Sequence, residues 1–163
     1  MSLAEWAKRQ TDPSIKTALA KLWALPEVEH GVEPPFAVGN KGTYHQGHMG
    51  PDGKPRHLSK EIRSAPVIQI TMAGLRTIQH SVNPQRVEQY LRDPDMRPAQ
   101  NRGKTSDGHG GPVDYPIVVQ QGGVRYIHDG HHRLSATKLL GDDRAWVRYV
   151  DLDAEKKATS GAR

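Results

Sequence analysis

Apolar residues recur along the chain with two spacings, which separate the predicted helices from the predicted strands. A spacing of three or four residues predicts three helices, at 13–25, 84–93 and 131–140. Asp12 and Asn83 each precede a proline, which is the usual order of an N-cap residue and the first helical position. Gly141 is a natural stop for the third helix.

Apolar runs of five or six residues predict four strands, at 67–72, 117–121, 124–128 and 145–150. Gly122 and Gly123 separate the second strand from the third, which predicts a tight two-residue hairpin. Residues 74–80 are expected to be a plain connection, and residues 142–143 a turn before the last strand.

Two long segments are rich in Gly, Pro and polar residues and are expected to be loops. Residues 27–60 carry repeated turn signals, enough for one hairpin. His45 and His48 have a spacing that suits a metal site, but zinc needs two further ligands and no second pair is recognisable. A basic arm that contacts phosphate and a solvated loop are the alternatives for this segment.

The second long segment, residues 93–114, has almost no apolar residue. Its basic residues Arg97, Arg102 and Lys104 are predicted to contact nucleic acid by closing over a bound polyanion. Simple disorder is the alternative.

Composition limits the class of protein. The 163 residues suit one domain with appendages, and the absence of Cys excludes disulfides and thiolate metal sites. A net charge of +5 favours nucleotides or nucleic acid as partners, the alternative being a basic protein without such a partner. No apolar run is long enough to span a membrane and the first ten residues lack a signal-peptide pattern, so a cytoplasmic protein is expected.

The most informative stretch is Asp129-Gly130-His131-His132-Arg133, where a predicted strand passes into a predicted helix. His131, His132 and Arg133 occupy the first helical turn, beside backbone N–H groups that have no helical partner. Those groups and the helix dipole favour negative charge, so a phosphate-sized ligand is the first hypothesis. Gly130 is expected to take an unusual φ that lets the backbone approach the anion.

The helical period also predicts how these side chains face. His132 shares one face with three apolar residues: Ala136, Leu139 and Leu140. His132 is therefore expected to face inward and His131 to lie on a wetter side, with Arg133 at the edge of the apolar stripe. The alternatives are a hydrogen-bonded core histidine at His132 and a surface ion-pair partner at Arg133.

The same stretch, with the Pro116-Ile117-Val118-Val119 segment before it, resembles the core of the ParB/sulfiredoxin-like superfamily. The pattern PI.V, followed by DG.HR..A....G, is met by Pro116, Ile117, Val119, Asp129, Gly130, His132, Arg133, Ala136 and Gly141. The resemblance covers roughly Val67 to Asp151. It implies an α+β fold with a small mixed sheet and packed helices, to which this chain adds an N-terminal helix and long loops.

Members of that superfamily include partition proteins that bind CTP and DNA, nuclease-like proteins, sulfiredoxins and free-serine kinases, and their Gly-x-His/Arg-Arg turn resembles a nucleotide-phosphate cradle. Sulfiredoxins place a catalytic Cys in this turn, and this chain has no Cys, so that chemistry is excluded. Partition proteins usually have Glu-Arg-Arg after the glycine and continue into further domains. A complete partition protein is therefore not expected, and a standalone ParB-like domain would suit a phage or mobile element.

Four regions are expected: an N-terminal helical extension at 1–26, a Gly/Pro/His-rich loop region at 27–65, the ParB/sulfiredoxin-like core at 66–152 and a polar tail at 153–163. The N-terminal helix is expected to pack on the core, and docking of a protein partner is the alternative.

Two classes of function compete. The first is a phosphate-binding enzyme, either a nuclease or phosphohydrolase or, by resemblance to free-serine kinases, an ATP- or ADP-dependent phosphotransferase. There Asp129, His131 and His132 are the predicted catalytic residues, and Asp129 would bind Mg²⁺ beside a nucleotide. The second is a non-catalytic DNA- or nucleotide-binding module, in which Gly130, His131 and the following two residues hold a phosphate. The lack of a second acidic cluster for a two-metal site favours the second class.

Overall fold

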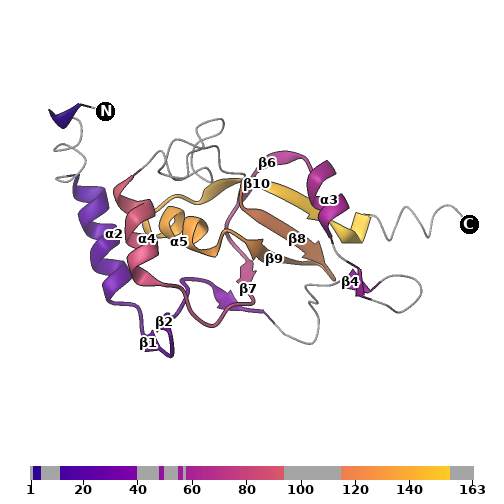
Figure 1. The fold of residues 1–163 in the computed structure, drawn as a ribbon, viewed down its shortest axis with the longest axis horizontal. Helices are drawn as coiled ribbons and strands as arrows, with labels where there is room; N and C mark the ends of the chain where they lie inside the picture. The colour runs from indigo at the N-terminus through magenta and orange to yellow at the C-terminus, as the bar shows by residue number, and fades with distance from the viewer. Residues whose placement is uncertain are drawn as a thin grey trace, which may run out of the picture.

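The computed structural model describes residues 2–4, 12–39, 48–49, 55–56, 58–93 and 115–154. These residues form a mixed α+β fold around a six-stranded sheet with the strand order β3-β7-β9-β8-β10-β6 (Figure 1). Its strands are β3 Ala37–Val38, β6 Val67–Thr71, β7 Leu75–Thr77, β8 Ile117–Gln121, β9 Val124–Asp129 and β10 Arg144–Asp151. Strands β8 and β9, and β10 and β6, pair antiparallel, whereas β10 with β8, β7 with β9, and β3 with β7 pair parallel, so the sheet is mixed.

The four strands predicted from apolar runs are confirmed to within one residue at either end. Gly122 and Gly123 join β8 to β9 with φ of 62° and 74°, which confirms the tight hairpin. The carboxylate of Asp153 accepts the backbone N–H groups of both glycines, at 2.8 and 2.9 Å, and so fixes the tip of this hairpin.

The expectation of a plain connection at residues 74–80 is wrong, because strand β7 lies there and pairs with β9. A strand of three residues is too short to carry a clear period, and only Leu75 marks it as apolar. Residues 27–60 likewise hold more than one hairpin. They contain β3 and two short antiparallel pairs: β1 Glu27–Val28 with β2 Gly31–Val32, and β4 His48–Met49 with β5 Pro55–Arg56.

The helices are α2 Pro13–Trp23, α3 Ser59–Ser64, α4 Pro84–Arg92 and α5 His131–Leu139. Both predicted N-caps are confirmed: Asp12 accepts the N–H of Ser14 at 2.9 Å, and Asn83 accepts those of Gln85 and Arg86 at 3.0 and 3.3 Å. No helix in the described part of the chain is long and apolar enough to cross a membrane.

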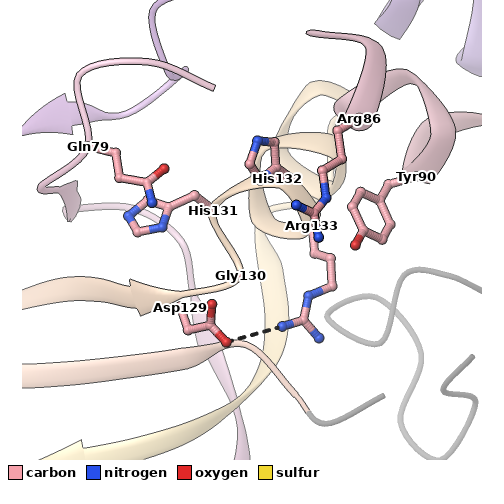
Figure 2. A pocket seen from close by; sticks show the side chains of 8 residues that line it. All are labelled: Gln79, Arg86, Tyr90, Asp129, Gly130, His131, His132 and Arg133. Carbon is pink, nitrogen blue, oxygen red and sulfur yellow. Dashed lines mark ion pairs between the residues drawn. The ribbon is translucent and has the colours of Figure 1, made fainter. Parts of the chain in front are cut away.

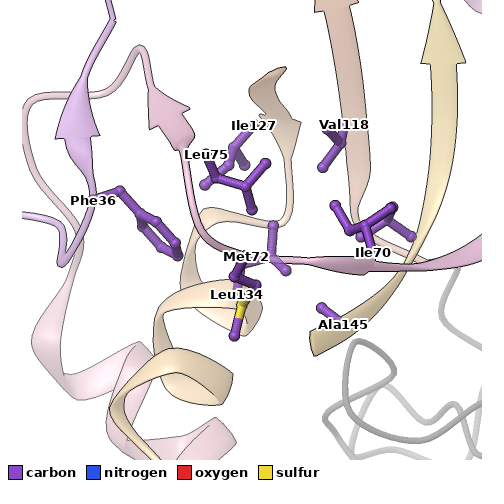
Figure 3. Packing of buried hydrophobic residues seen from close by; sticks show 9 residues of the cluster. Phe36, Ile70, Met72, Leu75, Val118, Ile127, Leu134 and Ala145 are labelled. Carbon is purple, nitrogen blue, oxygen red and sulfur yellow. The ribbon is translucent and has the colours of Figure 1, made fainter. Parts of the chain in front are cut away.

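The two faces of the sheet carry separate apolar clusters, because neighbouring strand residues point to opposite sides. On one face Val118 and Ile127 pack with Leu134 of α5 and with Phe36 (Figure 3). On the other face lies a cluster of buried residues: Leu58, Ala65, Val119, Tyr126, Val150 and Leu152.

Helices α2, α4 and α5 lie side by side at one end of the sheet (Figure 1). Their shared core includes Leu22 from α2, Val87 and Leu91 from α4, and Ala136 and Leu139 from α5, all of them buried. The N-terminal helix therefore packs on the rest of the chain, as expected. Helix α5 lies between the sheet and the other two helices, and seven of its nine residues are buried.

Candidate functional site

A pocket of about 280 Å³ lies where β9 passes into α5. All five residues from 129 to 133 line it, together with Gln79, Arg86 and Tyr90. In Figure 2, Gln79 and His131 lie on one side of the pocket, and the guanidinium groups of Arg86 and Arg133 lie on the other.

Gly130 makes the turn from strand to helix in the left-handed region, with φ of 87° and ψ of 28°. A Cβ built on it would lie 2.7 Å from the Cβ of Pro116, so both the backbone conformation and the available space require glycine. The unusual φ expected from the sequence is confirmed.

The first turn of α5 has no side-chain cap within the described residues. The first helical hydrogen bond runs from the N–H of Leu134 to the carbonyl of Gly130, at 2.9 Å. The N–H groups of His131, His132 and Arg133 precede that bond, so the helix itself does not use them. They offer three donors at the positive end of the helix dipole.

His131 is 3% exposed. Its Nε2 is buried and has no hydrogen-bond partner among the residues that the structure describes. Burial, followed by the nearby His132 and His128, lowers the pKa of His131 to about 4 against the opposing effect of Asp129, so the ring is neutral near pH 7. The expectation that His131 lies on the wetter side is therefore wrong, because the sheet and the helical layer cover α5 on two sides.

His132 is only partly buried, and its Nε2 accepts the backbone N–H of Asn83 at 3.1 Å. A nitrogen that accepts a hydrogen bond carries no proton, so the neutral ring carries its proton on Nδ1. Burial and then Arg86 lower the pKa of His132, with Asp129 opposing, which favours the same neutral form. His132 thus holds the start of α4 and still presents an N–H donor.

Arg133 is 7% exposed, so it is a buried cation and not a surface residue at the edge of the apolar stripe. Its guanidinium nitrogen lies 3.8 Å from a carboxylate oxygen of Asp129, whose side chain is 68% exposed (Figure 2). Because the guanidinium is buried, the Arg133→Ala change is expected to lower fold stability as well as ligand affinity.

Sequence reasoning missed three lining residues: Gln79, Arg86 and Tyr90. Arg86 and Tyr90 are four residues apart on α4 and therefore share a face of that helix. Tyr90 packs against the core that α4 shares with α5, and it is partly buried there while it lines the pocket. Nothing local in the sequence connects these residues with α5, since the packing of α4 on α5 brings them together.

Three predicted site residues, those expected to contact nucleic acid, lie in a segment that the structure does not describe. Arg97, Arg102 and Lys104 fall outside the described residues, as does His45. No group of three or more His, Cys, Asp or Glu side chains within the described ranges is arranged to hold a metal ion. Of the pocket residues, Asp129 alone would supply a carboxylate to a cation.

Comparison with known proteins identifies no relative: no protein family, no curated protein and no solved structure matches this chain. The geometry and charges of the pocket therefore carry the functional conclusion.

Proposed function

We propose that the pocket at the start of α5 binds a phosphate group of a nucleotide or nucleic acid. The observation that carries the proposal is the convergence of Arg86 and Arg133, from two different helices, on the uncapped N-terminus of α5. Guanidinium forks and the backbone N–H groups at helix N-termini are both common donors to phosphate oxygens. The Nδ1–H of His132 would add a neutral donor to the same set.

The size of the pocket narrows the ligand. A volume of about 280 Å³ lies just below the usual range of small-molecule sites, about 300–1,000 Å³. It suits a phosphate with its adjoining sugar better than a nucleotide that is enclosed as a whole. The base would then lie at the pocket opening or outside it.

We further propose that the chain has the ParB/sulfiredoxin-like architecture. Its support is the Asp-Gly-x-His-Arg turn between β9 and α5, in a mixed sheet where β8 pairs antiparallel with β9 and parallel with β10. In that superfamily the corresponding turn resembles a nucleotide-phosphate cradle, which agrees with the ligand proposed from the pocket chemistry.

A second candidate function is catalysis at the bound phosphate, as a nuclease, a phosphohydrolase or a phosphotransferase. The observation that favours it is the buried ring of His131, whose Nε2 has no partner among the described residues and which stays neutral near pH 7, as a general base must. Turnover of a phosphodiester or of ATP by the wild-type protein, lost in His131→Gln, would establish it. If the protein binds the ligand but does not turn it over, catalysis is rejected and the proposed function is binding alone.

Mg²⁺ is the cation that such a reaction would employ, and Asp129 is the pocket residue that would hold it. A single carboxylate does not complete the coordination of Mg²⁺, so the phosphate groups of the ligand would supply further oxygen ligands. Any turnover is then expected to stop after EDTA treatment and to return with added Mg²⁺. Turnover that survives EDTA would remove Asp129 from this role.

The binding proposal is tested by calorimetric titration of nucleotides into the wild-type protein and Arg86→Ala. Arg86 is exposed, so its removal should leave the fold intact while it weakens binding about tenfold, the scale of one charge-assisted hydrogen bond. Lys21→Ala is the matched control, because it removes the same charge from an exposed position on α2, outside the pocket. Equal affinities in Arg86→Ala, Lys21→Ala and wild type would reject the site.

A further inference from the structure

The described side chains that line the pocket include more cations than anions. Among its described lining residues, Arg86 and Arg133 are cations and Asp129 is an anion. His132 adds no charge, because its Nε2 accepts a backbone N–H, and His131 adds none, because its ring is 3% exposed and burial disfavours the protonated form. These side chains therefore carry a net charge of one positive unit.

Asp129 occupies a position that any bound phosphate must approach. Its carboxylate lies 3.8 Å from the guanidinium of Arg133, and its side chain remains 68% exposed. A phosphate that reaches the guanidinium of Arg133 therefore also meets a negative charge. The repulsion by Asp129 and the attraction by the two guanidinium groups both grow in proportion to the charge of the ligand. Asp129 therefore offsets more of the attraction for a doubly charged phosphate than for a singly charged one.

We propose that Asp129 is a specificity residue that shifts the selectivity of this pocket away from the doubly charged terminal phosphate and toward the singly charged phosphodiester group. The inference rests on the proposed phosphate binding and adds the class of phosphate to it. A terminal phosphate has a second pKa of about 6 and is therefore a dianion at pH 8, whereas an internal diester keeps a single negative charge. Phosphodiesters occur in nucleic acid strands and in small esters, and both sources fit this chemistry.

Two probes isolate the charge: adenosine 5′-monophosphate and its methyl ester, which share the base, the sugar and the phosphorus. Each is titrated by calorimetry at pH 8, at fixed ionic strength and with EDTA, so that no divalent cation bridges Asp129 to the ligand. A short single-stranded oligonucleotide without terminal phosphates is the third probe. Tighter binding of the oligonucleotide than of the methyl ester assigns the diester to nucleic acid, and equal or weaker binding assigns it to small esters.

The ratio of the affinity for the monophosphate to that for its methyl ester should be smaller in the wild-type protein than in Asp129→Asn. Asp129→Asn should raise the affinity for the ester about threefold and for the monophosphate about tenfold, since one unit of exposed charge has twice the effect on a dianion. Asp143→Asn is the control, because it removes an equal charge beyond the other end of α5, about 13 Å along the helix. It should change neither affinity.

Two results would overturn the inference, and they are distinguishable. If Asp129→Asn improves the affinity for the monophosphate and for its ester equally, or changes neither, the selectivity role of Asp129 is refuted while phosphate binding stands. If no probe binds the wild-type protein or Asp129→Asn, phosphate binding at this pocket is refuted as well.

Discussion

The backbone N–H of Asn83 donates a hydrogen bond to Nε2 of His132 across 3.1 Å, and this bond joins the start of α4 to the start of α5. The side chain of Asn83 also caps α4 and accepts the N–H of Arg86. Arg86 therefore sits one turn beyond a residue that His132 anchors. In this arrangement His132 positions Arg86 beside the first turn of α5, whichever ligand the pocket takes.

Replacement of His132 should accordingly affect the fold and the site together. His132→Ala removes the acceptor for Asn83 and should lower the free energy of unfolding by about 1 kcal/mol, the net value of one hydrogen bond. It should also weaken phosphate binding, because α4 loses its anchor. Urea unfolding and calorimetry measure the two effects, and His132→Gln, which keeps an acceptor oxygen, should restore part of both. A variant with unchanged stability and affinity would contradict the positioning role.

The buried histidines predict a loss of stability in mild acid. A histidine whose pKa is lower in the folded state binds its proton more readily when unfolded, so stability is complete above pH 6.5 and falls as the pH is lowered toward the folded pKa. For His131 that window runs from 6.5 to about 4. The pKa values of His128 and His132 are lowered as well, so these residues contribute in the same direction.

The size of the effect can be checked with one variant. Within this window His131 alone should lower the unfolding free energy by about 1.4 kcal/mol for each unit by which the pH falls. In His131→Gln the unfolding free energy should fall less steeply with falling pH, by the contribution of about one proton, whatever the stability of the variant at pH 7. Urea unfolding at pH 7.0, 6.0 and 5.0 measures the slope. Identical slopes in the wild type and His131→Gln would mean that His131 is not a buried neutral residue.

Gly130 and Gly141 form a natural comparison, because they have φ of 87° and 90° but different surroundings. No described heavy atom lies within 4 Å of a Cβ built on Gly141, whereas one built on Gly130 would meet Pro116. Gly141→Ala should therefore cost about 1 kcal/mol from backbone strain alone. Gly130→Ala should cost clearly more, and Gly130→Val should abolish ligand binding. Thermal melts rank the variants, and equal losses for the two alanine changes would show that the contact with Pro116 relaxes freely.

Asp153 gives a prediction that concerns the fold alone. Its carboxylate accepts the N–H groups of Gly122 and Gly123 and the side-chain amide of Gln120, at the opposite end of β9 from the pocket. Asp153→Ala should destabilise the protein by about 1–3 kcal/mol, the range of hydrogen bonds to a charged group, with phosphate affinity retained in the folded protein. If Asp153→Ala is as stable as the control Asp143→Ala, the carboxylate of Asp153 does not stabilise the hairpin.

Local signals predicted much of what builds the site. The N-caps Asp12 and Asn83, the hairpin at Gly122-Gly123 and the glycine turn before α5 are each set by neighbouring residues, so the sequence alone identifies them. Neighbouring residues could not predict which side chains of α5 are buried. A helical stripe assumes one buried side, but α5 is covered by the sheet and by the other helices, and His131 and Arg133 are buried outside the apolar stripe.

The other half of the pocket depends on contacts between distant segments. Arg86 and Tyr90 reach the pocket because Val87 and Leu91, on the same helix, pack with Ala136 and Leu139 of α5. That packing depends on the whole core, and no pattern within α4 indicates what its polar side chains face. The short strand β7 was missed for a related reason, since its pairing with β9 and not its three residues defines it.

Phosphate is proposed to bind at the backbone N–H groups in the first turn of α5. The most direct measurement is a titration of ¹⁵N-labelled protein with inorganic phosphate, followed by amide shifts in two-dimensional NMR. The largest changes are expected at the amides of His131, His132 and Arg133, with saturation at one common dissociation constant. The hairpin glycines Gly122 and Gly123, whose N–H groups Asp153 already occupies, should not move. Shifts concentrated at the hairpin or elsewhere, or no saturable shift in the first turn of α5, would contradict the account.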